Sequence, residues 1–265
     1  MKQSLCPVTS NVEVMPGVYL MWIEAPDIAV AAQPGQFITV RCGDFTLRRP
    51  FSIHQVSSRE IALLFKVAGK GTLWLSQREK GDTVDILGPL GKGFSIEPGV
   101  KNLLLVAGGI GIAPLVFLTQ RVSPQYQITL IHGASTAAQL YTERCQLTAI
   151  SPDLIGIQFI PVTEDGSMGQ KGRATDILPD FLNWADQVYA CGPADMYKAM
   201  AAMSLRAKRS NDALKKCQVC LEVRMGCGFG VCYGCTINTK RGSKQVCRDG
   251  PVFELDDIIW QEVRI

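Results

Sequence analysis

The chain has 265 residues, of which 47% are apolar and 19% are charged, so it carries enough apolar side chains for a packed core, and wholesale disorder is excluded. Its length is typical of two or three domains. The net charge of +3, from 27 Lys and Arg against 24 Asp and Glu, is too balanced to predict a surface for nucleic acid or for an anionic membrane.

The start of the chain indicates where the protein works. No apolar run long enough for an export signal precedes Pro16, so we expect the protein to stay in the cytoplasm, where thiols remain reduced. The stretch from Asn102 to Gln120 carries no charge and is long enough to suggest a membrane span. Glycines and Pro114 in its middle would break a lipid-facing helix, so we expect a soluble protein with no membrane partner.

Residues 1–98 have the pattern of a small antiparallel barrel domain. Gln36–Cys42 and Glu60–Val67 are short segments rich in β-branched and aromatic side chains, and turns of Gly and Pro separate them from their neighbours. Short strands at this spacing are typical of a barrel.

Residues 99–212 predict an α/β domain with a parallel sheet. Continuous apolar runs, as expected for strands covered on both faces, alternate here with helical stretches. The predicted strands are Asn102–Ala107, Gln127–Gly133, Ile155–Val162 and Gln187–Cys191, and the predicted helices are Pro114–Arg121 and Met196–Lys208.

Residues 213–265 are predicted as a small third domain that begins after a basic run. Five Lys and Arg lie between Arg206 and Lys216 with only Asp212 opposing them. Such a run is typical of a solvated helix end that complements the helix dipole, and a docking surface for a partner is the alternative.

Six of the ten cysteines lie between Cys217 and Cys247, which indicates a local metal or cluster site instead of a disulfide framework. Cys227, Cys232 and Cys235 have the spacing C-x4-C-x2-C, and Cys247 follows after eleven residues. This is the plant-type spacing for a two-iron, two-sulfide cluster. The intervening glycines, namely Gly226, Gly228, Gly230 and Gly234, would let the loop wrap closely around such a core.

A structural zinc ribbon is the alternative interpretation of the same segment. Cys217 and Cys220 form one CxxC pair, and Cys232 and Cys235 form a second. This arrangement would leave Cys227 and Cys247 without a role, whereas the iron–sulfur interpretation leaves only Cys217 and Cys220 over.

Two segments of the predicted barrel fit a flavin dinucleotide. In the first, Arg49 would neutralise a phosphate, Phe51 would lie against a flat ring, and Ser52 would bond the flavin edge, with Pro50 between them. The second, around a Gly-Lys-Gly-Thr turn, would hold a pyrophosphate, although the same letters also suit an ordinary hairpin. Its candidate contacts are Lys66, Val67, Ala68, Gly71 and Thr72.

Two glycine-containing turns of the α/β domain fit a nicotinamide nucleotide. Gly109, Gly111 and Pro114 follow an apolar strand and open a helix, where free N–H groups and small residues suit a phosphate. Cys191, followed by Gly192 and Pro193, ends another apolar strand, where a small side chain leaves room for a nicotinamide ring, and we give Cys191 as the candidate catalytic residue. A buried Cys before a tight turn is the alternative.

These motifs, RPFS, GGIGIAP and CGP, resemble those of the ferredoxin-NADP reductase superfamily. With the C-x4-C-x2-C-x11-C tail running into Asp249–Phe253, nearly the whole chain is similar to the electron-transfer subunits of dihydroorotate dehydrogenase B. The resemblance implies FAD on the barrel, NAD as the exchanged substrate and a 2Fe-2S cluster on the four cysteines. It also implies an FMN-containing catalytic subunit as partner, in a heterotetramer of two each, and a role in pyrimidine biosynthesis.

Alternatives remain open at this point. A sulfide dehydrogenase, a sulfhydrogenase or an NADH–ferredoxin oxidoreductase would use a subunit of similar layout, and a zinc-stabilised, non-redox nucleotide-binding protein is a more distant alternative. The segment Gly133–Gln139 has no Arg or Lys to bind a 2′-phosphate, which predicts a preference for NADH over NADPH. His54 and His132 are expected to be structural, and Cys6, Cys42 and Cys145 to serve packing.

Overall fold

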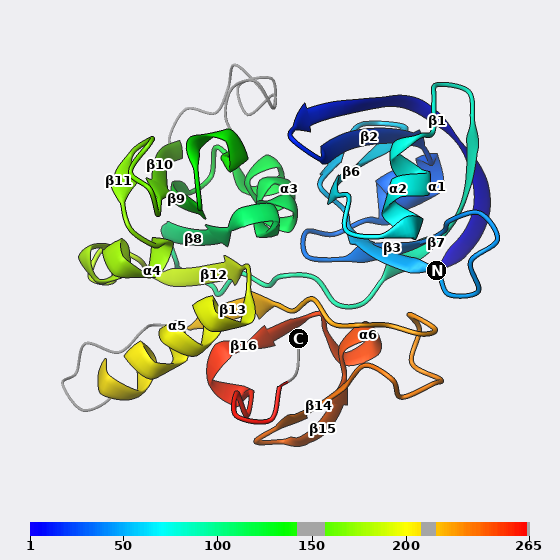
Figure 1. Cartoon of the computed structure of the whole chain (residues 1–265). Coiled ribbons are helices and arrows are strands. Elements are labelled where there is room, and N and C mark those ends of the chain that lie inside the picture. Colours follow the sequence, from blue (N-terminus) through cyan, green and yellow to red (C-terminus); the bar gives the residue numbers. More distant parts are fainter. Residues whose placement is uncertain (142–156, 208–215, 264–265) are drawn as a thin grey trace.

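The computed structural model describes residues 1–141, 157–207 and 216–263, which form two seven-stranded sheets and one small hairpin (Figure 1). Part of the basic run before Lys216, together with Cys145, lies outside the described residues. Within the described part of the chain, no helix is both long and apolar enough to cross a membrane.

The first sheet is antiparallel throughout and confirms the predicted barrel, with the strand order β4-β3-β7-β1-β2-β6-β5. The long strand β1 pairs with β7 through its first half and with β2 through its second half, which rolls the sheet. Alternate residues point inward, as the pattern of β7 shows, and fill the barrel with aliphatic side chains. The elements are β1 (Lys2–Met15), β2 (Val18–Glu24), α1 (Pro26–Ala31), β3 (Phe37–Arg41), β4 (Arg49–Ser52), β5 (Gln55–Val56), β6 (Glu60–Lys66), α2 (Lys70–Ser76) and β7 (Thr83–Leu90).

The second sheet is parallel except at one edge, with the order β11-β10-β9-β8-β12-β13-β16. After β8 the chain adds β9, β10 and β11 on one side of it and then β12 on the other side, so the carboxyl ends of β8 and β12 lie where sheets of this kind bind their ligands. The elements are β8 (Asn102–Gly108), η1 (Gly109–Gly111), α3 (Ile112–Val122), β9 (Gln127–Ala134), η2 (Ala137–Gln139), β10 (Ile157–Thr163), β11 (Gln170–Lys171), α4 (Ala174–Ile177), η5 (Leu178–Phe181), β12 (Gln187–Cys191) and α5 (Ala194–Ala207).

Two strands of the C-terminal segment join this sheet. Strand β13 (Cys217–Cys220) pairs in parallel with β12, and β16 (Val252–Glu254) pairs antiparallel with β13. All four residues of β13 are buried. Cys217 and Cys220, which the zinc-ribbon interpretation takes as metal ligands, are therefore buried side chains of a short strand. The remaining elements are β14 (Thr236–Thr239), β15 (Gly242–Gln245), α6 (Val246–Asp249) and η6 (Leu255–Asp257).

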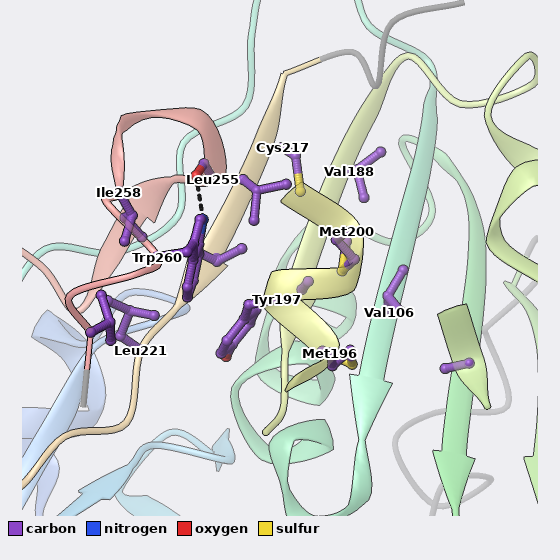
Figure 2. Close-up of a cluster of buried hydrophobic side chains, with 14 of the residues drawn as sticks. Val106, Val188, Met196, Tyr197, Met200, Cys217, Leu221, Leu255, Ile258 and Trp260 are labelled. Atoms are coloured by element: carbon purple, nitrogen blue, oxygen red, sulfur yellow. Dashed lines mark hydrogen bonds between the residues drawn. The ribbon is translucent and has the colours of Figure 1, made fainter. Parts of the chain in front are cut away.

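A buried cluster fastens the C-terminal segment to α5 (Figure 2). The rings of Tyr197 and Trp260 stack with their centroids 5.3 Å apart, and the Trp260 indole N–H donates to the Leu255 carbonyl at 3.0 Å. Met196 and Met200 on the same helix lie toward Val106 and Val188 of the sheet. Packing against α5 therefore holds the C-terminal segment on the α/β domain.

Candidate redox site

The two glycine turns of the α/β domain pack backbone against backbone at the carboxyl ends of β8 and β12. A Cβ added to Gly111 would lie 2.3 Å from the Cys191 carbonyl oxygen, and one added to Gly108 would lie 2.6 Å from Pro193 Cδ. Gly109 differs, because it has a φ of +53° and open space where a Cβ would stand. Gly111 is therefore required by the contact between the two turns, and Gly109 is the position that a ligand can approach.

Cys191 lies at the end of β12 with no exposed surface. It is hydrogen-bonded to the Cys220 side chain on the adjacent strand, and this bond together with burial raises the pKa of the Cys191 thiol well above its ordinary value. The Gly192 N–H donates to the Tyr197 hydroxyl at 2.9 Å, which in turn donates to the Cys220 carbonyl at 2.6 Å. Burial and the raised pKa thus keep the Cys191 thiol protonated and uncharged near neutral pH.

The predicted flavin motif forms β4, an edge strand of the barrel that pairs only with β3. Arg48 is tied to the Asp85 carboxylate at 2.6 Å, whereas no carboxylate of the described residues forms an ion pair with Arg49. The Arg49 guanidinium lies 5.8 Å from the centre of the Phe45 ring, and a Cβ on Gly71 would meet Arg49 Nε at 3.0 Å. Arg49 is therefore held beside the start of α2 with its charge uncompensated, as a phosphate partner requires.

The second flavin segment is the beginning of α2 and not the free turn that the sequence predicts. The Thr72 hydroxyl accepts the N–H groups of Ala68 and Gly69 at 2.9 and 3.1 Å and donates to the Gly69 carbonyl at 3.0 Å. That hydroxyl is thus engaged in its own helix start. The Val67 N–H bonds the Gly17 carbonyl of the barrel at 2.8 Å, and the Lys66 side chain is exposed at the end of β6.

Cys227 and Cys232 form one thiol pair of the C-terminal loop. Burial opposes ionisation of Cys227, but hydrogen bonds from the backbone N–H groups of Phe229, Cys232 and Val231 and from the Cys232 side chain lower its pKa to about 6. A Cβ on Gly226 would lie 3.2 Å from Cys232 Sγ. Backbone donors and small residues thus surround these sulfurs, as an iron–sulfur thiolate requires.

Cys235 and Cys247 form the second thiol pair. The Cys247 N–H donates to Cys235 Sγ at 3.4 Å. Burial, the hydrogen bond with Cys235 and the charges of Cys235 and Cys227 raise the pKa of Cys247 to about 12. The two pairs therefore lie close enough for the charge of Cys227 to influence the ionisation of Cys247.

This donor set fits a two-iron cluster better than a single zinc ion. Among the described residues no three metal-ligating side chains converge on one point, whereas two thiol pairs can supply two ligands to each of two irons. The alternative zinc ribbon does not fit, because Cys217 and Cys220 lie three residues apart on a strand and pack into different core clusters on opposite faces.

The cluster loop packs against the strand that pairs with the flavin motif. Gly228 has a φ of +83°, and a Cβ there would come within 2.8 Å of Thr39 Cγ2. Thr39 lies opposite Pro50 in the β3–β4 ladder, and its hydroxyl is a buried group with no hydrogen-bond partner in the described part of the chain. Farther along, the Lys92 N–H donates to the Gly250 carbonyl at 2.6 Å. The sequence gives no local signal for Thr39, because its importance comes from a contact with a distant loop.

The two histidines that the sequence predicts to be structural link the region after β4, the flavin strand, to the turn at Gly109–Gly111, the dinucleotide turn. His54 and His132 have no exposed surface, and burial lowers the pKa of each to about 4. They contact Ala113 and Gly109, respectively, and both contact Tyr141. In the sequence, only the position of His54, two residues after Ser52, indicates that it lies near the proposed flavin site.

Comparison with known proteins places these features in a family. The family model described as the iron-sulfur cluster binding domain of dihydroorotate dehydrogenase B matches residues 222–259, and the oxidoreductase NAD-binding domain matches residues 105–202. The dihydroorotate dehydrogenase B (NAD(+)) electron transfer subunit of Desulforamulus reducens is 40% identical over 94% of this chain and 95% of its own. The subunit of the same name from Caldanaerobacter subterraneus is 35% identical over 96% of this chain and 97% of its own.

Solved structures agree in fold. An NADH-dependent reduced ferredoxin-NADP oxidoreductase, studied for flavin-based electron bifurcation, superposes with a TM-score of 0.83 at 29% identity over 97% of this chain and 91% of that one. A ferredoxin NADP+ reductase of Neisseria gonorrhoeae, with bound FAD and NADP, superposes with a TM-score of 0.65 at 19% identity over 78% of this chain and 92% of that one, which shows the fold alone. From its near full-length identity to the curated relatives, the chain belongs to the family of dihydroorotate dehydrogenase B (NAD(+)) electron transfer subunits.

Proposed function

We propose that this chain transfers electrons between NAD(H) and a separate FMN-containing subunit that oxidises dihydroorotate, as a step of pyrimidine biosynthesis. The contact of Gly228 with Thr39 carries the proposal, because it brings the four-thiol loop against the strand beside the flavin motif. When bound, FAD supplies hydride exchange with NAD(H), and the iron–sulfur cluster supplies one-electron transfer.

The chain's own residues would hold these groups at separate ends of one path. Arg49 supplies the cation for the FAD pyrophosphate, Phe51 and Ser52 line the flavin, and Gly71 gives Arg49 room beside α2. The remaining flavin contacts proposed are Pro50, Lys66, Val67, Ala68 and Thr72. We propose Cys227, Cys232, Cys235 and Cys247 as the cluster ligands.

The dinucleotide would lie across the two glycine turns. Gly109 offers its open backbone to the phosphates, while Gly111, Gly192 and Pro193 keep the two turns in contact, and Pro114 belongs to the first turn of α3. Cys191 ends β12 with an uncharged side chain, so its role is to position the nicotinamide without exchanging a proton.

The partner would dock on the loop that carries Cys232. This cysteine is exposed, and Phe229, Val231 and Tyr233 around it expose 43%, 63% and 68% of their surfaces. Neighbouring exposed apolar side chains are typical of an interface core, and here they surround a proposed ligand, where electrons would leave. The proposal includes two copies of each subunit and a cytoplasmic location, where reduced thiols persist.

Reconstitution with the FMN-containing subunit tests the proposal. We expect the complex to reduce NAD+ with dihydroorotate, while this chain alone, loaded with FAD and cluster, reduces ferricyanide with NADH. Val231→Glu should lower only the dihydroorotate-dependent rate, and Val12→Glu, at a similarly exposed apolar position of β1, should lower neither. Absence of dihydroorotate-dependent activity in the reconstituted complex would refute it.

A second candidate, an NADH–ferredoxin oxidoreductase subunit, is favoured by the structural similarity to the ferredoxin-NADP oxidoreductase at 29% identity. It predicts NADH-dependent ferredoxin reduction and no response to dihydroorotate, so the same reconstitution separates the two functions.

A further inference from the structure

The only two histidines of the chain meet at one buried tyrosine between the barrel and the nucleotide sheet. His54 Nε2 lies 2.8 Å from the Tyr141 hydroxyl, and His54 Nδ1 lies 3.0 Å from the Ala113 carbonyl. The Tyr141 N–H bonds His132 Nδ1 at 3.3 Å, and His132 Nε2 lies 3.0 Å from the Gly109 carbonyl. Barrel, tyrosine and dinucleotide turn are thus joined by one continuous set of hydrogen bonds.

The partners assign the proton on each ring. A carbonyl only accepts, so His54 donates from Nδ1 to Ala113 and accepts from the Tyr141 hydroxyl at Nε2. The Tyr141 N–H only donates, so His132 accepts at Nδ1 and donates from Nε2 to Gly109. Every ring nitrogen is satisfied with the ring neutral, which agrees with the lowered pKa of both residues.

The network fixes the one residue of the dinucleotide turn that packing leaves unsupported. Gly109 has a positive φ and nothing within 4 Å of a Cβ, unlike Gly108 and Gly111, which are clamped against the second turn. Its carbonyl accepts from the Ile112 N–H of its own turn and from His132, and His132 is the contact that comes from another element. At the other end, His54 is two residues from Ser52 of the flavin motif.

The barrel holds α3 at both ends of the helix, with the bond of His54 to the Ala113 carbonyl near its start and a separate contact near its end. At the far end of the helix, the Gln120 side chain accepts from the Val56 N–H at 3.0 Å and donates to the Val56 carbonyl at 2.7 Å. The contact at the far end of α3 therefore involves neither histidine, and of these three side chains His132 is the one that bonds the Gly109 turn.

We propose that His132 and His54, joined through Tyr141, are positioning residues for NAD binding that hold the Gly109 turn in register with the flavin strand. The inference rests on the proposed function, because it takes Gly109 as a contact of the dinucleotide. The histidines act through the backbone and touch neither the substrate nor the flavin.

The experiment compares His132→Leu, His132→Gln and Gln120→Leu in protein loaded with FAD and cluster. NAD+ dissociation constants from calorimetry and the KM and kcat of NADH–ferricyanide activity are measured, with FAD content as a check on folding. Loss of the bond to Gly109 in His132→Leu should raise the dissociation constant and the KM about tenfold and change kcat less. The Gln amide nitrogen is as many bonds from the backbone as Nε2, so His132→Gln should restore binding to within about threefold of wild type.

The control and the outcomes separate positioning from a general structural role. Gln120→Leu should leave the NAD+ dissociation constant near the wild-type value. Wild-type binding in His132→Leu, no recovery in His132→Gln, or an equal loss in Gln120→Leu would each overturn the proposal. If His132→Leu does not fold, Tyr141→Phe replaces it, since it removes the hydroxyl bond to His54 and keeps the aromatic ring, and unchanged NAD+ binding in that variant overturns the proposal. A wild-type protein that oxidises no NADH would instead contradict the proposed function.

Discussion

Gly228 of the cluster loop and Thr39 of the barrel touch so closely that a Cβ on the glycine would come within 2.8 Å of the threonine methyl. Because Thr39 lies opposite Pro50, this contact sets the separation between the thiol loop and the flavin strand. Gly228 is also at a φ of +83°, where only glycine is unstrained. Both the close contact with Thr39 and the positive φ therefore require glycine at residue 228.

We expect Gly228→Ala to slow dihydroorotate-dependent NAD+ reduction severalfold by pushing the loop from the barrel, while NADH–ferricyanide activity persists. Gly242→Ala is the matched control, because Gly242 has a similar φ of +92° and nothing within 4 Å of a Cβ. It carries the same backbone cost, about 1 kcal/mol, without the collision. Equal rates in the two variants would show that the contact with Thr39 does not matter.

Gly111→Ala should destabilise the nucleotide domain far more than Gly109→Ala. The new methyl at residue 111 would collide with the Cys191 carbonyl, a cost on the order of 3 kcal/mol, whereas that at residue 109 meets open space and costs about 1 kcal/mol. Urea unfolding followed by circular dichroism measures both. Gly109→Ala should instead weaken NADH binding, and the reverse ranking of stabilities would contradict the assignment.

Cys235→Ala should abolish the cluster, and Cys217→Ala should retain it. Both residues are buried cysteines, but Cys235 is paired with Cys247, while Cys217 lies in β13 among apolar side chains, where burial raises the pKa of its thiol. Iron and acid-labile sulfide content of the purified variants provides the measurement. Loss of iron from Cys217→Ala, or stoichiometric zinc in the wild type, would contradict the ligand set.

Both histidines should be neutral down to about pH 5, and in opposite tautomers. NMR of protein labelled with 15N in histidine should show His54 protonated at Nδ1 and His132 at Nε2. An imidazolium signal at pH 6 would contradict the burial of either ring.

The same pKa values predict how stability changes with pH. The folded pKa of about 4 lies below the unfolded value of 6.5, so the unfolded chain takes up protons first. Stability is therefore full above pH 6.5 and falls as the pH drops toward 4, by about 3 kcal/mol for each histidine. His132→Gln should remove about half of this loss in urea unfolding measured between pH 7 and 5.

NADH should be used on the order of tenfold or more efficiently than NADPH, because a 2′-phosphate lacks a charged hydrogen bond worth about 1.5 kcal/mol or more. The segment after β9 carries no Lys or Arg through Gln139, and the Asp165 N–H bonds the Ser135 carbonyl beside it at 3.3 Å. Hydrogen bonds from Ser167 lower the pKa of Asp165 and keep it anionic. Asp165→Asn removes a negative charge that would repel the 2′-phosphate, so it should reduce the preference for NADH over NADPH in steady-state assays. Equal catalytic efficiencies of the wild type with NADH and NADPH would refute the predicted preference.

The sequence by itself determined the local chemistry of this protein. Apolar runs placed β8, β9 and β12 within a residue of their observed bounds, and the spacing of four cysteines predicts the cluster site. These features are readable because strand burial and ligand spacing depend on residues close together along the chain.

Tertiary structure decided which distant segments meet. Only packing separates Gly111, which touches Cys191, from Gly109, which faces open space, although both stand in one motif. Only packing adds β13 to the nucleotide sheet, because short buried strands pair according to the register of their neighbours. The contact of Gly228 with Thr39 likewise joins residues that are far apart along the chain. No local sequence pattern predicts it, because it forms only when the two segments are packed together.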